Sequence, residues 1–285
     1  MTLVISIPTA DGFVMAADSR ALYEGHFYDY REKLHVGRGQ GPIGFAVTGS
    51  ADFPWTIAPG YSPAEWLPHV PYFFRAKDKV QTYLERNPGV VLNHEAIHEV
   101  AHFLALSVVD FFTEQPEICA RHIGRDMCRL VLCQVDPLND EPLYGAITLS
   151  IDLHRKVSLT NPRFMRYRAI DTVECELNGE GEYVTHHVVN GEGRHFIHND
   201  DAELWAQRGE IRNFGKADAA RYAAALIRAA EQTTERFPIP SGSGIGGRVT
   251  TLLVKATACD PLEPDRNSRG CAIRDNSGEP PSCPR

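Results

Sequence analysis

Short apolar runs separated by polar turns dominate the first fifty residues. The runs at 2–8 and 12–18 are rich in β-branched side chains, and the sequence TADG between them is typical of a tight turn. The runs at 33–36 and 42–49 repeat this pattern around the glycine-rich sequence RGQGP. The pattern therefore predicts a meander of four short strands.

Helical periodicity begins near residue 72. Apolar side chains recur every three or four positions at 72–86 and again after Asn93, a typical N-cap residue. A second long helix is expected at 216–235, with small residues along one face. Further strands are expected at 128–135, 143–151, 182–189 and 248–256.

The order of these elements is strands, two helices, strands, one helix and a last strand. This order favours an α+β domain in which two sheets are covered by helices. We expect the domain to span residues 1–258. Residues 259–285 are rich in Pro, Gly, Asn and Ser with few apolar side chains, so a disordered tail is expected there.

Composition narrows the function classes. The 285 residues carry a net charge of −8, which argues against a nucleic-acid binder because such a protein needs a basic face. No apolar run approaches the roughly 20 residues that span a bilayer, so no membrane partner is expected. Without a charged-then-apolar leader, and with seven scattered cysteines suited to a reducing compartment, a cytoplasmic protein is expected.

The residue after Met1 is a threonine. Removal of Met1 would give Thr2 a hydroxyl and a free α-amine on the same residue. The amine, with an ordinary pKa of roughly 7.7–8, is a suitable base to activate that hydroxyl. Such a nucleophile also needs a cation that lowers the hydroxyl pKa, an acid that holds the cation, and a backbone N–H for the oxyanion.

One residue of each kind stands at the end of a predicted strand. Asp18 closes the second strand, Lys33 opens the third, and Gly49 closes the fourth, where its N–H is unobstructed by a side chain. In a meander, alternate strand ends lie side by side, so these residues could converge with Thr2. Each has an ordinary alternative: Asp18 as a turn cap, Lys33 as a solvated edge residue and Gly49 as a simple turn.

Together these stretches resemble proteasome β-type subunits, a family of N-terminal-nucleophile hydrolases that includes the bacterial HslV protease. The resemblance rests on a threonine at the mature terminus, on DGFVMAADSR, on the Lys-Leu-His strand and on the strand that ends AVTGSAD. It is close over residues 2–55 and returns at GKADAARYAAALIRAA and at the strand after SGSGIGG; over 56–210 only the element order agrees. It implies a four-layer αββα sandwich, the Ntn-hydrolase fold.

The resemblance also implies roles for individual residues. Thr2 would be nucleophile and base, Lys33 would lower the pKa of its hydroxyl, and Asp18 would orient Lys33. The N–H of Gly49 would form the oxyanion hole. Val47 would lie near the substrate pocket and give it an apolar preference.

The activity so implied is that of a threonine endopeptidase. It would hydrolyse peptides or unfolded proteins through an acyl-enzyme on Thr2, without a cofactor or metal. The family further implies a self-assembled homo-oligomeric ring and an ATPase or unfoldase partner.

The sequence departs from the family pattern in its supporting groups. The Ser-Gly-Ser segment after the later strands has no clear counterpart. Before the last strand stands PSGSGIGG at 240–247, where Ser243 or Ser241 takes the place of the family's serine and no aspartate occupies the expected offset. Lys33 also comes one residue early. These losses support an alternative hypothesis, a ring-forming subunit whose catalytic activity has decayed.

A second alternative is a zinc metallopeptidase. Residues 98–102 read HEVAH on a predicted helix, so two histidines four apart could bind zinc with Glu99 as the base. The next residues, FLALSV, lack the glycine and third histidine of metzincins. A third ligand would have to be Glu114 or Glu117.

Overall fold

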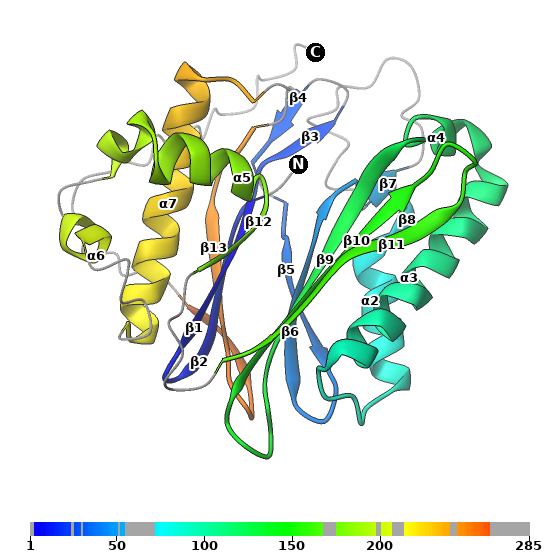
Figure 1. Cartoon of the computed structure of the whole chain (residues 1–285), viewed down its shortest axis with the longest axis horizontal. Helices are drawn as coiled ribbons and strands as arrows, with labels where there is room; N and C mark the ends of the chain where they lie inside the picture. The colour runs from blue at the N-terminus through cyan, green and yellow to red at the C-terminus, as the bar shows by residue number, and fades with distance from the viewer. Residues whose placement is uncertain are drawn as a thin grey trace, which may run out of the picture.

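Two five-stranded antiparallel sheets form the centre of the protein (Figure 1). The computed structural model describes residues 3–23, 26–29, 31–50, 52–54, 72–167, 175–197, 201–206, 214–239 and 244–262, and the structural statements below concern these residues. Their α+β class and antiparallel sheets agree with the sequence prediction.

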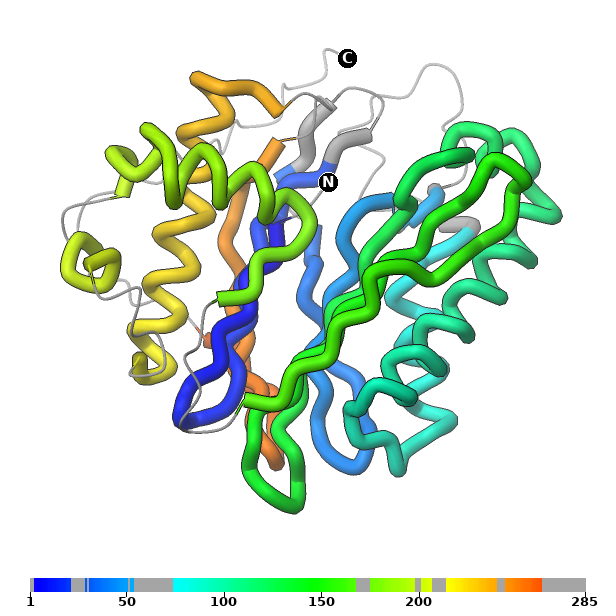
Figure 2. Tube along the Cα trace, in the orientation of Figure 1, coloured from blue at the N-terminus to red at the C-terminus, as the bar shows by residue number. Residues whose placement is uncertain are grey.

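The first sheet has the strand order β12-β1-β2-β13-β14. Its strands are, in that order, Glu176–Gly179, Leu3–Thr9, Gly12–Asp18, Val249–Val254 and Cys259–Leu262. The two ends of the described chain meet in this sheet, since the hairpin of β1 and β2 lies beside β13 (Figure 2). In this pairing Val249 lies opposite Asp18, so the start of β13 adjoins the end of β2.

The second sheet has the strand order β11-β10-β9-β6-β5. Its strands are, in that order, Val157–Arg166, Pro142–Ile151, Arg125–Val135, Pro42–Gly49 and Leu34–Arg38. Two small antiparallel pairs complete the strands: β3 with β4 and β7 with β8, at Ala21–Tyr23, His26–Tyr28, Asp52–Pro54 and Tyr72–Arg75.

Helices lie on the outer face of each sheet (Figure 1). On the second sheet these are α2 (Ala76–Arg86) and α3 (His94–Glu114), followed by the short α4 (Pro116–Ala120). On the first sheet the main helix is α7 (Lys216–Arg236). Shorter helical segments follow β12 in the sequence and precede α7. They are α5 at Gly181–Val184, the π-helical η1 at Thr185–Val189, the 3-10 helix η2 at Glu192–Phe196 and α6 at Ala202–Ala206.

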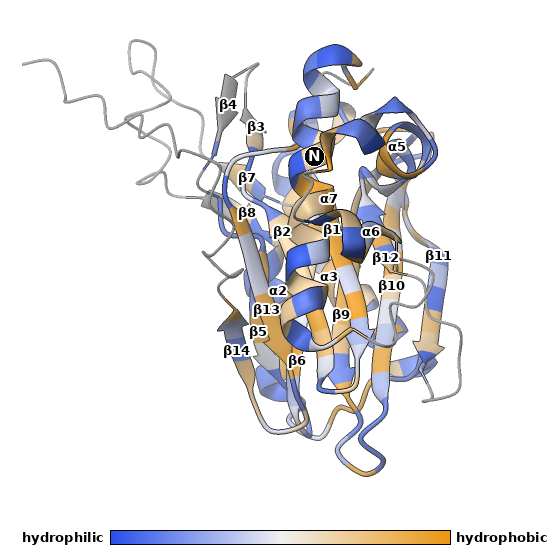
Figure 3. Cartoon of the chain, turned by 90° about the vertical axis from the view of Figure 1, so that its left-hand side faces the viewer, coloured by the Kyte–Doolittle hydropathy of each residue, from blue (hydrophilic) through white to orange (hydrophobic). Residues whose placement is uncertain are grey.

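Three apolar clusters hold these layers together. One joins the second sheet to α2 and α3, one joins the first sheet to α7, and the third lies where the two sheets face each other. Both central strands β1 and β2 are buried along their whole length, and Figure 3 shows the hydrophobic colour gathered on the interior strands β1, β9 and β13. Continuous burial explains why their apolar runs show no polar alternation.

The predicted strand at 182–189 is wrong. These residues form α5 and η1 instead. Val184 and Val188 lie four residues apart and are both fully buried against the cluster under α7, so helical spacing serves the packing here and overrides the β-propensity of valine. The helix predicted at 72–86 begins at Ala76, after the short strand β8. The strands β11 and β12 were not predicted, because β11 is a largely exposed edge strand and β12 has only four residues.

The first sheet extends into the segment expected to be a tail. Cys259–Leu262 form β14 and pair with β13, with Cys259 opposite Val254. Ordered structure therefore continues four residues beyond the expected boundary at 258. Residues 263–285 lie outside the described residues.

One helix, α3, is long and apolar enough to cross a membrane by length and composition alone. Its apolar residues, among them Ile97, Leu104 and Val108, are buried against the second sheet. A core helix of this kind passes the same test, so the finding is weak evidence for a membrane span.

The histidine in β5 makes stability depend on pH. His35 lies opposite Phe45 in the β5–β6 pair, and their ring centroids are 5.3 Å apart. Burial, followed by the nearby charge of Lys77, lowers the pKa of His35 from 6.5 to about 4. A pKa lowered on folding gives stability that is complete above pH 6.5 and is lost as the pH falls through 4.

We therefore expect the wild-type protein to lose about 3 kcal/mol of unfolding free energy between pH 7 and pH 4 through His35 alone. Urea unfolding at the two pH values should show this loss reduced by about that amount in His35→Gln. The matched control is His195→Gln, at an exposed position of η2, which should keep the full loss. An equal loss in both variants would contradict the prediction.

Candidate functional site

The end of β2 and the residue before β5 meet in a buried ion pair. Asp18 is fully buried and Lys33 is 6% exposed, and Lys33 Nζ lies 3.0 Å from Asp18 Oδ1. Asp18 ends β2 in the first sheet, whereas Lys33 leads into the second sheet. The pair therefore joins the two sheets at one end, as the sequence predicted for these two residues.

Four donors surround the Asp18 carboxylate. Oδ1 accepts from the Leu3 N–H at 2.9 Å and from Lys33, and Oδ2 accepts from the N–H groups of Arg20 at 3.2 Å and Gly246 at 3.3 Å. A carboxylate offers about four acceptor positions, so all are used. This set satisfies a charge that would otherwise be costly to bury.

Lys33 has two acceptors among the described residues. Besides Asp18 it donates to the backbone carbonyl of Arg20. Burial lowers the pKa of Lys33 below its usual value, and the adjacent Asp18 carboxylate opposes part of that shift. The group is thus a cation held in place by the protein, with a proton that is easier to release than in water.

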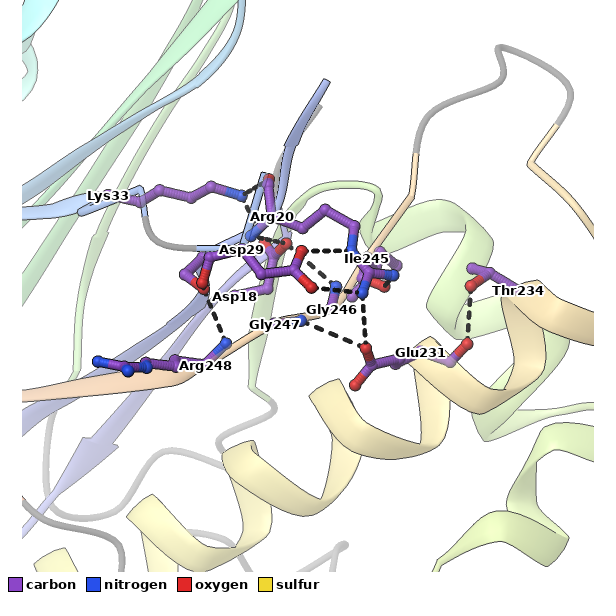
Figure 4. A network of polar contacts seen from close by, with 11 residues as sticks. Asp18, Arg20, Asp29, Lys33, Glu231, Thr234, Ile245, Gly246, Gly247 and Arg248 are labelled. Carbon is purple, nitrogen blue, oxygen red and sulfur yellow. Dashed lines mark hydrogen bonds and ion pairs between the residues drawn. The ribbon is translucent and has the colours of Figure 1, made fainter. Parts of the chain in front are cut away.

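Arg20 supports this pair through a second network, shown in Figure 4. Its guanidinium binds the Asp29 carboxylate at 2.7 and 2.9 Å and Glu231 of α7 at 3.0 Å, and also donates to the Ile245 carbonyl at 3.1 Å. The backbone of the same residue contacts both Asp18 and Lys33. The side chain of Arg20 therefore fixes the backbone groups that hold the ion pair.

Two glycines just before β13, Gly246 and Gly247, lie within this network. Gly246 has φ +151°, and a Cβ there would lie 2.3 Å from Glu231 Oε1 and 2.6 Å from the Arg20 guanidinium. Gly247 has φ +79°, and its Cβ would lie 2.6 Å from Ser19 Oγ. Since L side chains rarely adopt such φ values, only glycine brings the Gly246 N–H onto Asp18 without strain.

Gly49, at the end of β6, is also required by its surroundings. Its φ is +87°, and an added Cβ would lie 2.6 Å from the Met127 carbonyl oxygen of the neighbouring strand. The β5–β6 register pairs Leu34 with Ala46, so Gly49 and Lys33 belong to the same end of the second sheet. Its role as oxyanion donor stays a prediction.

The remaining predicted residues are less well defined. Thr2 and Ser243, together with Ser241, lie outside the described residues. Val47 is partly buried and packs against the cluster between the second sheet and its helices. Its place in a substrate pocket stays a prediction.

Sequence reasoning missed the groups that complete the site. Gly246 and Leu3 both donate to Asp18 through their backbone N–H groups. Every residue except proline has such a group, so the residue type does not reveal this role. Glu231 lies on a helix far along the chain, and only its contact with Arg20 identifies it. The signal that could have been used is the double glycine at 246–247, because adjacent glycines before a strand often mark positive φ values.

In the HEVAH segment of α3, Val100 and Ala101 are buried, whereas Glu99 and His102 are exposed. Glu99 accepts a hydrogen bond from the Tyr83 hydroxyl at 2.8 Å, and His102 is exposed. Within the described part of the chain, no group of three or more His, Cys, Asp or Glu side chains is arranged to hold a metal ion. The geometry of these residues therefore gives the zinc hypothesis no third ligand.

Comparison with solved structures supports the fold. The helical assembly of the Anbu complex from Pseudomonas aeruginosa matches with a TM-score of 0.50 and 14% identity, covering 94% of this chain and 88% of that chain. Anbu (ancestral beta-subunit) from Yersinia bercovieri matches with a TM-score of 0.43 and 13% identity, over 92% and 88%. No protein-family description and no curated protein matches the sequence.

These comparisons correct the family resemblance. The sequence resemblance pointed to proteasome β-type and HslV subunits, whereas the structures that match are Anbu proteins, a related but distinct proteasome-like group. At 14% identity the likeness establishes the fold alone. The roles of individual residues must therefore be argued from this chain's own contacts.

The buried ion pair gives a first prediction for the site. Asp18→Asn leaves Lys33 charged and without its counterion, which should cost about 3–5 kcal/mol of unfolding free energy. Adding Lys33→Met should recover part of that loss, because it removes the uncompensated charge. Urea unfolding measures both effects.

The control is Asp78→Asn, which breaks the surface pair between Arg75, just before α2, and Asp78 in its first turn, and should cost under about 1 kcal/mol. If Asp18→Asn cost no more than this surface variant, the ion pair would not be the anchor described above.

Gly49 gives a second prediction. Gly49→Ala should cost about 1–3 kcal/mol because of its positive φ and the close Met127 carbonyl. Gly89→Ala is the matched control, since a Cβ there meets nothing within 4 Å, and its effect should stay within about 0.5 kcal/mol. Thermal unfolding should give a lower midpoint temperature for Gly49→Ala than for Gly89→Ala. Equal midpoint temperatures would contradict the geometry assigned to Gly49.

Proposed function

We propose that the protein is a threonine peptidase, or more generally an amide hydrolase, whose nucleophile is Thr2 after cleavage of the chain before that residue. The observation that carries the proposal is the shared acceptor Asp18 Oδ1, which binds both Lys33 and the N–H of Leu3. In this proposal the layers of helices and sheets form the αββα sandwich of an N-terminal-nucleophile hydrolase.

Covalent connectivity supports the choice of nucleophile. The Leu3 nitrogen and Lys33 Nζ lie 2.9 and 3.0 Å from the same oxygen, so the two nitrogens are close neighbours. The Cα atom of residue 2 is about 2.4 Å from the Leu3 nitrogen in every conformation. In this proposal the hydroxyl of Thr2 contacts the Lys33 ammonium.

The hydrogen bonds of Lys33 support the same assignment. An ammonium has three N–H groups, and among the described residues Lys33 uses two of them, on Asp18 and on the Arg20 carbonyl. The third can donate to the hydroxyl oxygen of Thr2 and lower its pKa. Burial of Lys33 strengthens this effect, because charges act more strongly away from water.

The proposed reaction balances without a cofactor. Oγ of Thr2 attacks the amide carbonyl carbon while its proton passes to the α-amine of the same residue. The tetrahedral intermediate collapses, the C–N bond breaks, and the leaving amine takes that proton. Water then attacks the resulting ester, which releases the acid and restores the Thr2 hydroxyl. The N–H of Gly49 is the proposed donor to the oxyanion.

Self-association is part of the proposal. The Anbu complex from Pseudomonas aeruginosa, which shares the fold, forms a helical assembly. We infer that this chain also assembles with copies of itself. The missing aspartate before β13 supports a second candidate, an assembling subunit that has lost its activity.

The deciding measurement uses a peptide epoxyketone. This electrophile closes a ring with the hydroxyl and the free α-amine of one residue, so it reports both groups together. Intact and peptide-level mass spectrometry should show one adduct on Thr2. Thr2→Ala should abolish the adduct, and Lys33→Met should slow it by about 100-fold or more.

Lys216→Met, at an exposed position at the start of α7, is the matched control and should react like the wild type. Residue 2 found without a free amine, and without an adduct, would refute the proposed mechanism. A free Thr2 amine without an adduct, in a protein that still assembles, would favour the inactive subunit.

A further inference from the structure

Arg129, on β9, lies between the two sheets and has no counterion among the residues that the structure describes. Arg129 of β9 is partly buried, and among the described residues no carboxylate lies within ion-pair distance of it. Its Nε donates to Asn178 Oδ1 at 3.0 Å, and its Nη1 donates to Thr148 Oγ1 at 3.0 Å. These two contacts fix the guanidinium plane and leave Nη2 without a partner in the described part of the chain.

Asn178, which accepts from Arg129, also carries a buried donor of its own. Asn178 is 3% exposed, and its Oδ1 also accepts from the Tyr144 hydroxyl at 2.9 Å. Because both neighbours donate to Oδ1, the orientation of the amide is determined and Nδ2 must point elsewhere. Nδ2 is buried and has no acceptor among the described residues. Buried donors are nearly always satisfied, so Nδ2 is expected to have an acceptor that is not among the described residues.

The position of these groups relates them to the proposed nucleophile. Asn178 lies opposite Val4 in the β1–β12 pair, one step from the Leu3–Gly179 pair where β1 begins. Val4 belongs to the cluster between the sheets, whereas Leu3 faces α7. Val4, the cross-strand neighbour of Asn178, therefore lies on the side of β1 that faces the layer containing Arg129, two residues along the chain from Thr2.

We propose that Arg129 and Asn178 bind a carboxylate of the substrate, so that the enzyme prefers amides next to an acidic side chain or a free α-carboxylate. Guanidinium and amide N–H groups fixed by neighbouring residues form strong, charge-assisted hydrogen bonds to a carboxylate. This inference rests on the proposed function.

A purely structural bridge is the alternative, since Arg129 links β9 to Thr148 of β10 and to Asn178 of β12. Such a bridge needs the hydrogen bonds and not the charge. If Arg129 binds the substrate carboxylate, removing its charge changes the preference for acidic substrates. If Arg129 is only a structural bridge, that preference does not depend on its charge.

The test compares two peptide epoxyketones that differ only in the side chain beside the electrophile, glutamate or glutamine. Second-order rate constants for Thr2 modification come from intact mass spectrometry. The wild type should react about 10- to 100-fold faster with the glutamate probe. Arg129→Met should bring the ratio of the two rate constants close to 1, and Arg129→Lys should restore part of the preference.

Two further variants serve as controls for the effect of the Arg129 charge. Arg166→Met removes the same charge from the end of the edge strand β11, where Arg166 is partnered by Asp136 and Glu141, and should keep the preference. Asn178→Asp supplies Arg129 with an internal counterion and should abolish the preference without removing the arginine. An unchanged ratio in Arg129→Met, or a wild type that prefers glutamine, would overturn the proposal.

Failure of the proposed chemistry is separable from failure of this site. If neither probe modified Thr2, the threonine mechanism would fail, and binding alone would test Arg129. Calorimetry with N-acetylglutamate amide and N-acetylglutamine amide should then show binding of the glutamate compound only, lost in Arg129→Met. Equal binding of both compounds, or no binding of either, would overturn the carboxylate site.

Discussion

The buried Asp18 carboxylate is the constraint on which the arrangement of this site depends. An ionised carboxylate removed from water must find a full set of donors, and here they come from the start of β1, the turn after β2, the residue before β5 and the segment before β13. One charge therefore fixes four segments that are distant in sequence. The precision of the site follows from the cost of leaving that charge unsatisfied.

Support for the carboxylate continues into the helical layer. Arg20 donates its N–H to Asp18 and accepts from Lys33 through its carbonyl, while Asp29 and Glu231 hold its side chain. The ion pair is thus connected to α7 through a single residue. Such a connection explains why the turn at 246–247 must be glycine, since both residues pass where side chains would collide with the network.

Residue types allowed part of this to be predicted. Asp18 and Lys33 could be found because ionisable residues beside buried strands need partners, and the ends of the meander bring them together. Gly246 and Leu3 could not, because they act through backbone atoms. The helix at 182–189 was missed because the buried spacing of Val184 and Val188 becomes visible only against α7. Local pattern thus predicts strand ends well, and fails where packing over long sequence distances decides.

The two cations near the start of β1 differ in what they can do, and the difference lies in their partners. Lys33 is neutralised by Asp18, and burial lowers its pKa, so it is suited to influence a proton on a neighbouring hydroxyl. Arg129 has only neutral partners in the described structure. A guanidinium held in place by neutral partners is suited to a different task. It is suited to binding an anion, and in a chain of net charge −8 its lack of a carboxylate partner reflects its position between the sheets rather than a shortage of acidic residues.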